Sequence, residues 1–192
     1  MKNESYTSRE DSQLLRSVLS SERGGSLIEI GAGYGSNLKS VSGNFHLAVG
    51  TDIRKTDAFE ILRNTGIELV LTDRASCFRP STFDLVAMNP PYVPSEGIED
   101  LSTDGGRGGF EIPRLFLDDA LRVMKIEGRA LIVLSSETDL DEFMEYCVRN
   151  SIKFVSLAEK RLFFETLFVF ELERESASKI ASMSQHFESR SE

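Results

Sequence analysis

The 192-residue chain contains no tryptophan, only two histidines and only two cysteines. Cys77 and Cys147 stand apart, without the paired spacing of a zinc site or a redox-active dithiol. Since only His46 and His186 could complete a ligand set, we expect no metal site. We interpret both cysteines as small buried hydrophobic residues and both histidines as structural or solvated.

Long apolar runs are also missing, and none approaches the roughly 20 residues that a membrane-spanning helix requires. The chain starts with the polar sequence MKNESYTSRED, which has no apolar core of the kind found in secretory signal peptides. We therefore expect a cytoplasmic protein that does not associate with membranes.

Positive charge is scarce, because 22 Lys and Arg face 31 Asp and Glu, giving a formal net charge of −9. Proteins that bind nucleic acid concentrate basic residues in order to neutralise phosphates. No run of basic residues offsets the negative balance here. The composition therefore favours a protein over a nucleic acid as the macromolecular substrate.

The remaining composition is typical of one globular domain, with 40% hydrophobic and 28% charged residues. A chain of this length accommodates one full domain and little more. We expect that domain over residues 1–173. Residues 174–192 are rich in Ser and charge and predict a frayed or marginally helical tail.

Short β-rich runs alternate with segments of helical spacing along the chain. Five of these runs predict strands, at residues 26–29, 47–53, 68–72, 83–88 and 130–134. Helices are predicted before, between and after them, at 11–19, 37–41, 58–64, 112–125 and 139–150. Such alternation favours right-handed βαβ units and a parallel sheet.

The alternation of strands and helices stops near the end of the chain, where two β-rich runs at 153–158 and 166–172 follow each other without a helix between them. This spacing predicts an antiparallel hairpin at one edge of the sheet. The expected fold is therefore α/β and Rossmann-like. It has a mostly parallel seven-stranded sheet, an antiparallel C-terminal edge hairpin and helices on both faces.

A candidate ligand site follows the first predicted strand, in the sequence Glu29-Ile30-Gly31-Ala32-Gly33-Tyr34-Gly35. Its glycines allow the backbone to turn sharply and to approach a ligand closely. Asp52 ends the second strand 21 residues after Gly31, where an acid can accept hydrogen bonds from a ribose diol. Together these features indicate a nucleoside-containing ligand.

A dinucleotide is the competing ligand for this turn. Dinucleotide-binding enzymes use Gly-x-Gly-x-x-Gly, whereas here the third glycine is displaced to Gly35. Glu29 at the strand end would also repel a pyrophosphate. A positively charged sulfonium ligand without phosphate, S-adenosylmethionine, fits better. Asp73, just after the third strand, is either an acceptor for the adenine amino group or a simple turn residue.

The second candidate site is Asn89-Pro90-Pro91-Tyr92, which directly follows the strand predicted at 83–88. In open parallel sheets, ligands bind beyond the carboxyl ends of the strands. A conjugated nitrogen is a poor nucleophile, and two acceptors, the Asn89 side-chain oxygen and the Pro90 carbonyl, could hold its hydrogens and expose its lone pair. Tyr92 could stack on the flat target group. The motif thus predicts methylation of an amide or amino nitrogen.

This motif resembles the signature of the class I amino-methyltransferases. The sequence resembles the HemK/PrmC group, which methylates the glutamine amide in the Gly-Gly-Gln motif of translation release factors, and within it the short archaeal and eukaryotic HemK2/Mtq2 form. Three further segments carry the resemblance, at residues 6–15 (YTSREDSQLL), 105–109 (GGRGG) and 165–170 (ETLFVF). It covers roughly residues 6–172.

The resemblance implies S-adenosylmethionine as cofactor and a set of residues around it: Ser12, Glu29, Gly31, Gly33, Asp52, Ile53, Asp73, Arg74 and Asn89. It implies Asn89, Pro90 and Tyr92 as catalytic residues, and Asn89, Pro91 and Tyr92 as contacts for the target amide. Ser8 and Ser12 stand where the family has Pro and Thr, so the N-terminal contacts depart from the family pattern.

The resemblance also implies partners. The substrate would be a translation release factor, gripped without the N-terminal helical domain of the bacterial enzymes. A zinc-binding activator of the Trm112 type would form a heterodimer, with the strand at 68–72 or the helix before it as the contact edge. An apolar third strand is equally expected as plain core.

Other functions share part of this pattern. An N6-adenine methyltransferase uses the same motif, but the charge of −9 and the need to grip a flipped base disfavour it. Lysine methylation requires deprotonation rather than loss of conjugation. A non-catalytic module would not need both Asn89 and Tyr92. Whether 105–109 is a mobile lid or a turn stays open.

Overall fold

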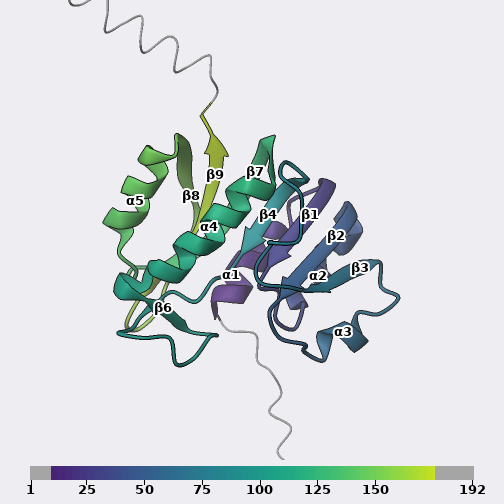
Figure 1. Cartoon of the computed structure of the whole chain (residues 1–192), viewed down its shortest axis with the longest axis horizontal. Helices are drawn as coiled ribbons and strands as arrows, with labels where there is room; N and C mark the ends of the chain where they lie inside the picture. The colour runs from purple at the N-terminus through teal and green to yellow at the C-terminus, as the bar shows by residue number, and fades with distance from the viewer. Residues whose placement is uncertain (1–9, 176–192) are drawn as a thin grey trace, which may run out of the picture.

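The computed structural model describes residues 10–175. Its centre is a seven-stranded sheet with the strand order β3-β2-β1-β4-β7-β9-β8 (Figure 1). The strands of this sheet are β1 (Gly24–Ile30), β2 (Phe45–Asp52), β3 (Ile67–Leu71), β4 (Phe83–Met88), β7 (Met124–Ser135), β8 (Ile152–Arg161) and β9 (Thr166–Arg174).

Strands β3, β2, β1, β4 and β7 pair in parallel, as the alternating pattern predicted. The hairpin β8–β9 closes the other edge: β9 runs antiparallel to both β7 and β8, and β8 is the outermost strand. The predicted α/β fold with an antiparallel C-terminal hairpin is therefore confirmed.

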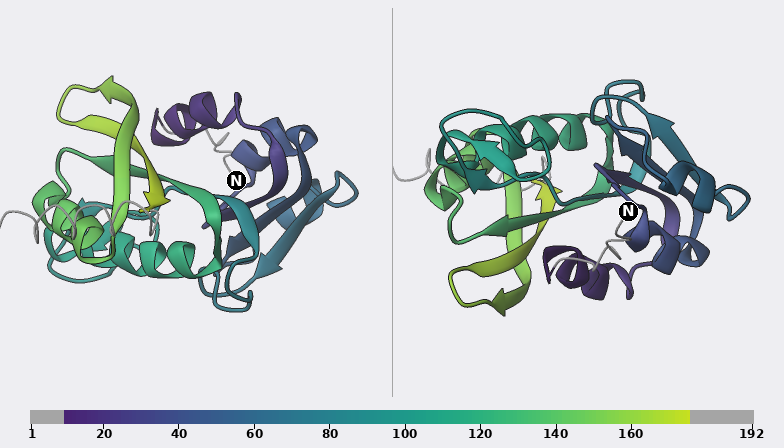
Figure 2. Two further views of the ribbon diagram at one scale, coloured as in Figure 1. Left: turned by 90° about the horizontal axis from the view of Figure 1, so that it is seen from above. Right: turned by 90° about the horizontal axis from the view of Figure 1, so that it is seen from below.

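Helices cover both faces of the sheet, α4 and α5 on one and α1 and α2 on the other (Figure 2). The described helices are α1 (Glu10–Leu19), α2 (Ser36–Val41), α3 (Ala58–Ile61), α4 (Glu111–Val123) and α5 (Leu140–Arg149), with short 3-10 turns η1 (Ser42–Asn44) and η2 (Arg107–Gly109). No helix within residues 10–175 is long and apolar enough to cross a membrane.

The strands are apolar on both sides because both faces are covered. Along β7, Leu131 and Val133 pack into the core beneath α1 and α2, whereas Ile132 and Leu134 pack into the core beneath α4 and α5. Side chains of a strand alternate between faces, so one continuous apolar run supplies two cores. β1 and β4 behave in the same way.

Two predicted helices end earlier than expected. The helix at 58–64 stops at Ile61, and Asn64 adopts a left-handed conformation with φ 68°. The helix at 112–125 stops at Val123, since Met124 is already extended and begins the long strand β7. The two-stranded sheet formed by β5 (Val93–Pro94) and β6 (Asp104–Gly106) was not predicted, because prolines argue against strand pairing.

The interpretation of both cysteines as buried was wrong for Cys77, which is exposed. It lies among the turns that join β3 to β4, where no helix packs on the sheet. Cys147 is buried in α5, and burial raises the pKa of its thiol to about 12.

The last described residues belong to the folded domain. β9 extends to Arg174, whose guanidinium donates to the Leu121 carbonyl, and the Glu175 amide donates to the Ser151 carbonyl. The rest of the predicted tail, including His186, lies outside the described residues, as does the part of the 6–15 segment before Glu10.

Candidate active site

The site lies at the switch point of the sheet, where β1 and β4 are neighbours. Ile30 pairs with Met88, so the chain leaves both strands at the same level, into Gly31 and Asn89. From β1 the chain winds outward through β2 and β3, and it returns on the other side as β4. Such a point opens a crevice at the carboxyl ends of the strands.

A cavity of about 500 Å³ opens at this point. Every residue that we predicted at the site lines the cavity except Pro90 and Tyr92. The lining consists of Asp11, Ser12, Glu29, Gly31, Ala32, Gly33, Tyr34, Ser36, Asn37, Asp52, Ile53, Arg54, Asp73, Arg74, Asn89, Pro91, Leu101, Ser102, Ile112 and Phe116. Segments more than 100 residues apart in the chain therefore meet in one cavity.

The turn after β1 requires glycine at three positions because of its backbone conformation. Gly31, Gly33 and Gly35 have φ of 75°, 55° and 66°, a region that other residues rarely adopt. A Cβ at Gly35 would also collide with Leu62 of the segment after α3. A Cβ at Gly33 would meet no protein atom within 4 Å. Gly33 thus leaves room for a ligand.

Asp52 ties the end of β2 to this turn. Its carboxylate accepts hydrogen bonds from the Gly33 amide at 2.9 Å and from the Arg54 amide at 2.8 Å. Each carboxylate oxygen can accept a second bond, so Asp52 retains acceptor capacity toward the cavity. Ile53 beside it is 57% exposed and offers an apolar surface within the cavity.

Glu29 is the buried acid of the site. One carboxylate oxygen accepts from the Asn37 side-chain amide at 2.8 Å, and Arg16 donates in turn to the Asn37 oxygen at 3.2 Å. The other carboxylate oxygen is buried without a partner. Burial raises the pKa of Glu29 to about 7, although the bonds from Asn37 and Leu38 and the charge of Arg16 oppose the rise. A cationic ligand would offset this cost.

Asn89 presents a second unsatisfied acceptor. Its side-chain oxygen is buried and has no hydrogen-bond partner, while its amide nitrogen lies 3.5 Å from the Ser12 hydroxyl of α1. Buried carbonyl oxygens are usually paired. An unpaired one at the wall of a cavity is suited to accept an N–H from a bound group.

Pro90 and Tyr92 support the loop from behind instead of lining the cavity. Pro90 is buried, and Tyr92 packs against both hydrophobic cores. The Tyr92 hydroxyl donates to the Asp11 carboxylate at 3.4 Å. Asp11 is only 8% exposed, and its part in the site was missed in the sequence. The available signal was its position in the 6–15 segment that carries the family resemblance.

The segment 105–109 packs against the same loop. A Cβ at Gly105 would lie 2.7 Å from the backbone of Tyr92, and a Cβ at Gly109 would collide with the Tyr92 carbonyl oxygen. The Gly108 carbonyl accepts from the Asp139 amide at 2.7 Å, which ties the segment to the start of α5. In this structure the segment is a packed turn that braces Tyr92.

Asp73 and Arg74 form the far rim of the cavity. Arg74 pairs with Asp73 at 2.9 Å and with Asp119 of α4 at 3.1 Å. The Asp73 side chain is 51% exposed, so it stays accessible to a ligand. Asn37, Phe116 and Leu101, which the sequence did not single out, complete the walls.

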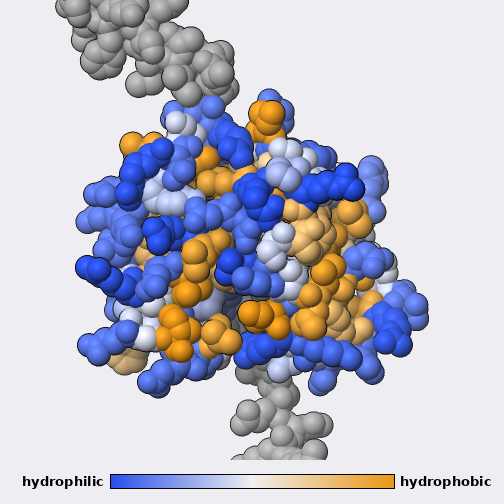
Figure 3. All heavy atoms as spheres, viewed as in Figure 1, coloured by the Kyte–Doolittle hydropathy of each residue, from blue (hydrophilic) through white to orange (hydrophobic). Residues whose placement is uncertain are grey.

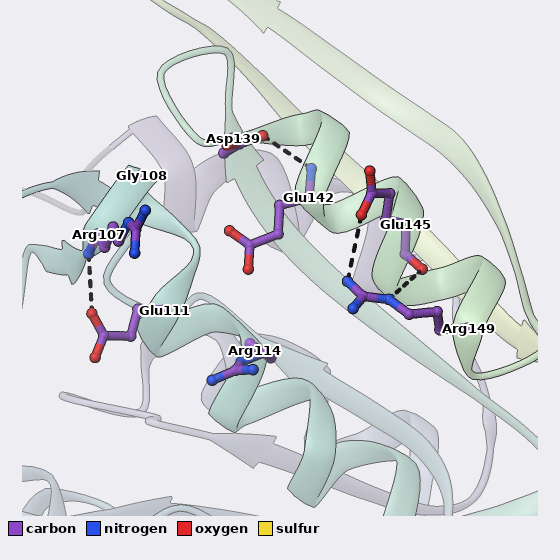
Figure 4. A pocket seen from close by; sticks show the side chains of 8 residues that line it. All are labelled: Arg107, Gly108, Glu111, Arg114, Asp139, Glu142, Glu145 and Arg149. Carbon is purple, nitrogen blue, oxygen red and sulfur yellow. Dashed lines mark hydrogen bonds and ion pairs between the residues drawn. The ribbon is translucent and has the colours of Figure 1, made fainter.

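A larger cavity of about 700 Å³ lies between η2, α4 and α5 (Figure 4). Its walls are formed by Arg107, Gly108, Glu111, Arg114, Asp139, Glu142, Glu145 and Arg149. These are mostly charged surface side chains, and Arg149 pairs with Glu145 at 3.7 Å. None of the unsatisfied buried acceptors lies there. We therefore assign the site to the smaller cavity.

The sheet order, the glycine turn after β1 and the acid at the end of β2 define a class I methyltransferase fold. The Mtq2–Trm112 complex of E. cuniculi, described as responsible for the methylation of the eRF1 translation termination factor, has this fold with a TM-score of 0.73. The match covers 88% of this chain and 98% of that one, at 22% identity.

In sequence, the chain is similar to two release factor glutamine methyltransferases. The protein of Caulobacter vibrioides is 30% identical over 123 residues, and that of Bradyrhizobium diazoefficiens is 33% identical over 129 residues. These matches cover 54% and 56% of this chain but only 43% and 42% of the relatives. No family model matches. The predicted resemblance to release factor methyltransferases is thereby confirmed.

Proposed function

We propose that the protein transfers a methyl group from S-adenosylmethionine to the side-chain amide nitrogen (N5) of a protein glutamine, in the Gly-Gly-Gln motif of a translation release factor. One observation carries this proposal: the buried, unpaired oxygen of Asn89 at the wall of the cavity. The names of the two sequence relatives and of the Mtq2 complex support the same substrate.

The residues at the glycine turn fit the cofactor. The unpaired oxygen of Glu29 would attract the positively charged methionine portion, and Asp52 would accept from the ribose hydroxyls. Ile53 and Phe116, which line the cavity, would offer apolar contacts to the adenine, and Asp73 would accept from its amino group. When bound, the cofactor supplies an electrophilic methyl group on a sulfonium.

The chain's own contribution at the acceptor is orientation. The glutamine amide would donate one N–H to the Asn89 oxygen at the cavity wall. The Pro90 carbonyl, which does not line the cavity of the ligand-free protein, is the proposed acceptor for the other N–H once the substrate is seated. Two such bonds would weaken conjugation and aim the nitrogen lone pair at the methyl group. The two acceptors also favour the positive charge that develops on nitrogen. The nitrogen then loses one proton to solvent. Tyr92, held by Asp11, keeps the loop in place.

A labelling experiment tests this function. The protein is incubated with labelled cofactor and a release factor whose Gly-Gly-Gln glutamine is either intact or replaced by alanine. We expect label on the intact factor alone. Duplex and single-stranded DNA serve as further substrates in the same assay, and label on DNA would replace the proposal with N6-adenine methylation.

An activating partner would sit at the free edge of β3. This strand is the last of the sheet, and Leu71 in it and Ile61 in α3 are 55% and 60% exposed. Figure 3 shows apolar surface on the β3 side of the molecule, at the right of the view. The Mtq2 structure is itself a complex with Trm112, so a zinc-binding protein of that type is the proposed partner.

Co-expression tests the partner. We expect the chain alone to be poorly soluble or to bind the cofactor weakly, and co-expression with a Trm112-type protein to correct this. Leu71→Lys should abolish the gain, whereas Leu157→Lys on the opposite edge strand β8 should preserve it. If co-expression changes neither solubility nor cofactor affinity, this partner is ruled out.

A further inference from the structure

The turn between β8 and β9 exposes two large aromatic side chains. Phe163 and Phe164 are 91% and 87% exposed, the highest values among the large hydrophobic residues of the described chain. Their rings pack edge to face, with centroids 4.6 Å apart. Burial of a Phe side chain stabilises a fold, so this exposed pair contributes little to the stability of the domain.

The turn is firmly held at its base. The Leu162 amide donates to the Glu165 carbonyl at 2.8 Å, and the Glu165 carboxylate accepts from the Ser135 hydroxyl at the end of β7. The Ser136 amide donates to the Thr166 carbonyl at 2.8 Å. The two phenylalanines are therefore presented on a rigid support.

Hydrogen bonds connect this support to the acceptor loop, residues 89–92. The Thr138 hydroxyl accepts from the Ser135 amide at 3.3 Å and donates to the Tyr92 carbonyl at 3.5 Å. On the other side, Lys160 pairs with Glu10 of α1, the helix whose next residues contact Tyr92 and Asn89. Both views of Figure 2 show the hairpin beside α1. The turn thus stands at the same end of the sheet as the cavity.

We propose that residues 162–165, the aromatic turn, form a docking surface for the protein that carries the target amide, an inference that rests on the proposed function. The Asn89 oxygen can hold only one side chain, so the rest of a macromolecular substrate must lie on the rim of the site. Rigid aromatic residues are favoured as anchors in such interfaces. The complementary surface is an apolar patch beside the glutamine loop.

The position of the turn argues for this occupant over a regulatory subunit. The hairpin forms the edge of the sheet opposite to β3, so a partner bound at the β3 edge would leave the aromatic turn exposed. The turn is linked instead to the loop that holds the acceptor. Because the glutamine binds at the acceptor loop, the rest of the substrate protein must contact the surface next to that loop.

The test compares two substrates that differ only in size: a full-length release factor and a short peptide with its Gly-Gly-Gln sequence. The variant carries Phe163→Ser and Phe164→Ser. We expect the KM for the full-length factor to rise roughly tenfold or more, with unchanged kcat, unchanged cofactor Kd and unchanged kcat/KM for the peptide. Val148→Ser, a 75% exposed residue on α5, is the matched control and should change none of these.

Several results would overturn the docking surface. One is an unchanged KM for the full-length factor, and another is an equal loss with the peptide, which would make the turn part of the site itself. A wild-type dimer in sedimentation that dissociates in the double variant would assign the turn to a second copy of the chain. If the wild type labels no release factor at all, the proposed function fails and this inference fails with it.

Discussion

The two halves of the site are built in different ways. On the β1–β2 side, Glu29, the glycine turn and Asp52 come from 24 consecutive residues, and Asp52 bonds to the turn directly. On the β4 side, the loop 89–92 depends on segments from elsewhere in the chain. These are α1 through Asp11, the turn 105–109, and Thr138 before α5.

The difference shows which half depends on the rest of the fold. The cofactor half uses left-handed glycines and strand-end acids, so its geometry is largely local. The acceptor loop is stiffened by prolines, but remote backbone and one buried carboxylate decide where it points. We therefore expect changes around the loop to impair turnover while sparing cofactor affinity, and changes in the first half to do the opposite.

The largest effect should come from Asn89→Ala. Removal of the acceptor oxygen should lower kcat roughly a hundredfold to a thousandfold, the usual loss for one group that stabilises developing charge. Cofactor Kd, measured by calorimetry, should change less than about threefold. Near-normal turnover would contradict the two-acceptor account, and a parallel loss of cofactor affinity would erase the contrast between the two halves.

A smaller but still large effect is expected from Gly109→Ala. The residue has φ 68°, and a Cβ would strike the Tyr92 carbonyl, so the variant should lose about 1–3 kcal/mol of stability. It should also lose roughly tenfold to hundredfold in kcat, since small displacements of reacting groups are costly.

Gly43→Ala is the matched control, because a Cβ at Gly43 would meet no atom within 4 Å. Thermal unfolding and kcat are the measurements. Equal behaviour of the two variants would show that the turn 105–109 does not brace the loop.

The cofactor half should respond to pH. The pKa of Glu29 is about 7 in the ligand-free protein, and only its ionised form attracts a cationic ligand. Cofactor Kd should therefore rise about tenfold from pH 8 to pH 6, as the ionised fraction falls. Glu29→Gln should give a weak affinity that no longer depends on pH. A flat wild-type profile would contradict the assignment of Glu29.

The same group affects stability with a definite sign. Its pKa in the folded protein lies above 4.5, the ordinary value of a glutamate, so the folded protein binds more protons than the unfolded chain between about pH 4.5 and 7. Its free energy of unfolding should consequently decrease as pH rises through that window. Glu29→Gln should remove this decrease.

The smallest effect is expected from Asp11→Ala, which removes the carboxylate that accepts from the Tyr92 hydroxyl. The bond from the Tyr92 hydroxyl to Asp11 is long, at 3.4 Å, so its loss should lower kcat by roughly twofold to fivefold. Cofactor Kd should stay the same. Ser17→Ala, an exposed position further along α1, is the control, and an equal or larger loss in Ser17→Ala would show that Asp11 does not position Tyr92.

Much of this protein could be predicted from local pattern. Alternating strands and helices specify a parallel sheet, and parallel strands place their carboxyl ends at one edge. The meeting of the segment after residue 88 with the glycine turn follows from that rule. Ser12, Glu29, Asp52 and Asn89 do line one cavity. The exposure of Cys77 was not predictable in this way, because it depends on a connection without a helix.

The contacts that support Tyr92 were not predictable, since they join residues with no local relation. Asp11 and Tyr92 are 81 positions apart in the chain, and nothing in either segment encodes the pairing. Tyr92 also packs between the two cores instead of lining the cavity, which depends on side chains from both faces of the sheet.

The sequence by itself determined the fold class and the glycine turn, and it predicted the chemistry proposed for Asn89-Pro90-Pro91-Tyr92, because backbone conformation and hydrogen-bonding capacity belong to individual residues. Only the tertiary structure decided which polar atoms lack partners. The oxygens of Glu29 and Asn89 are unsatisfied because other segments bury them without supplying a donor. The exposure of Phe163 and Phe164 has the same origin: no other part of the described chain covers them.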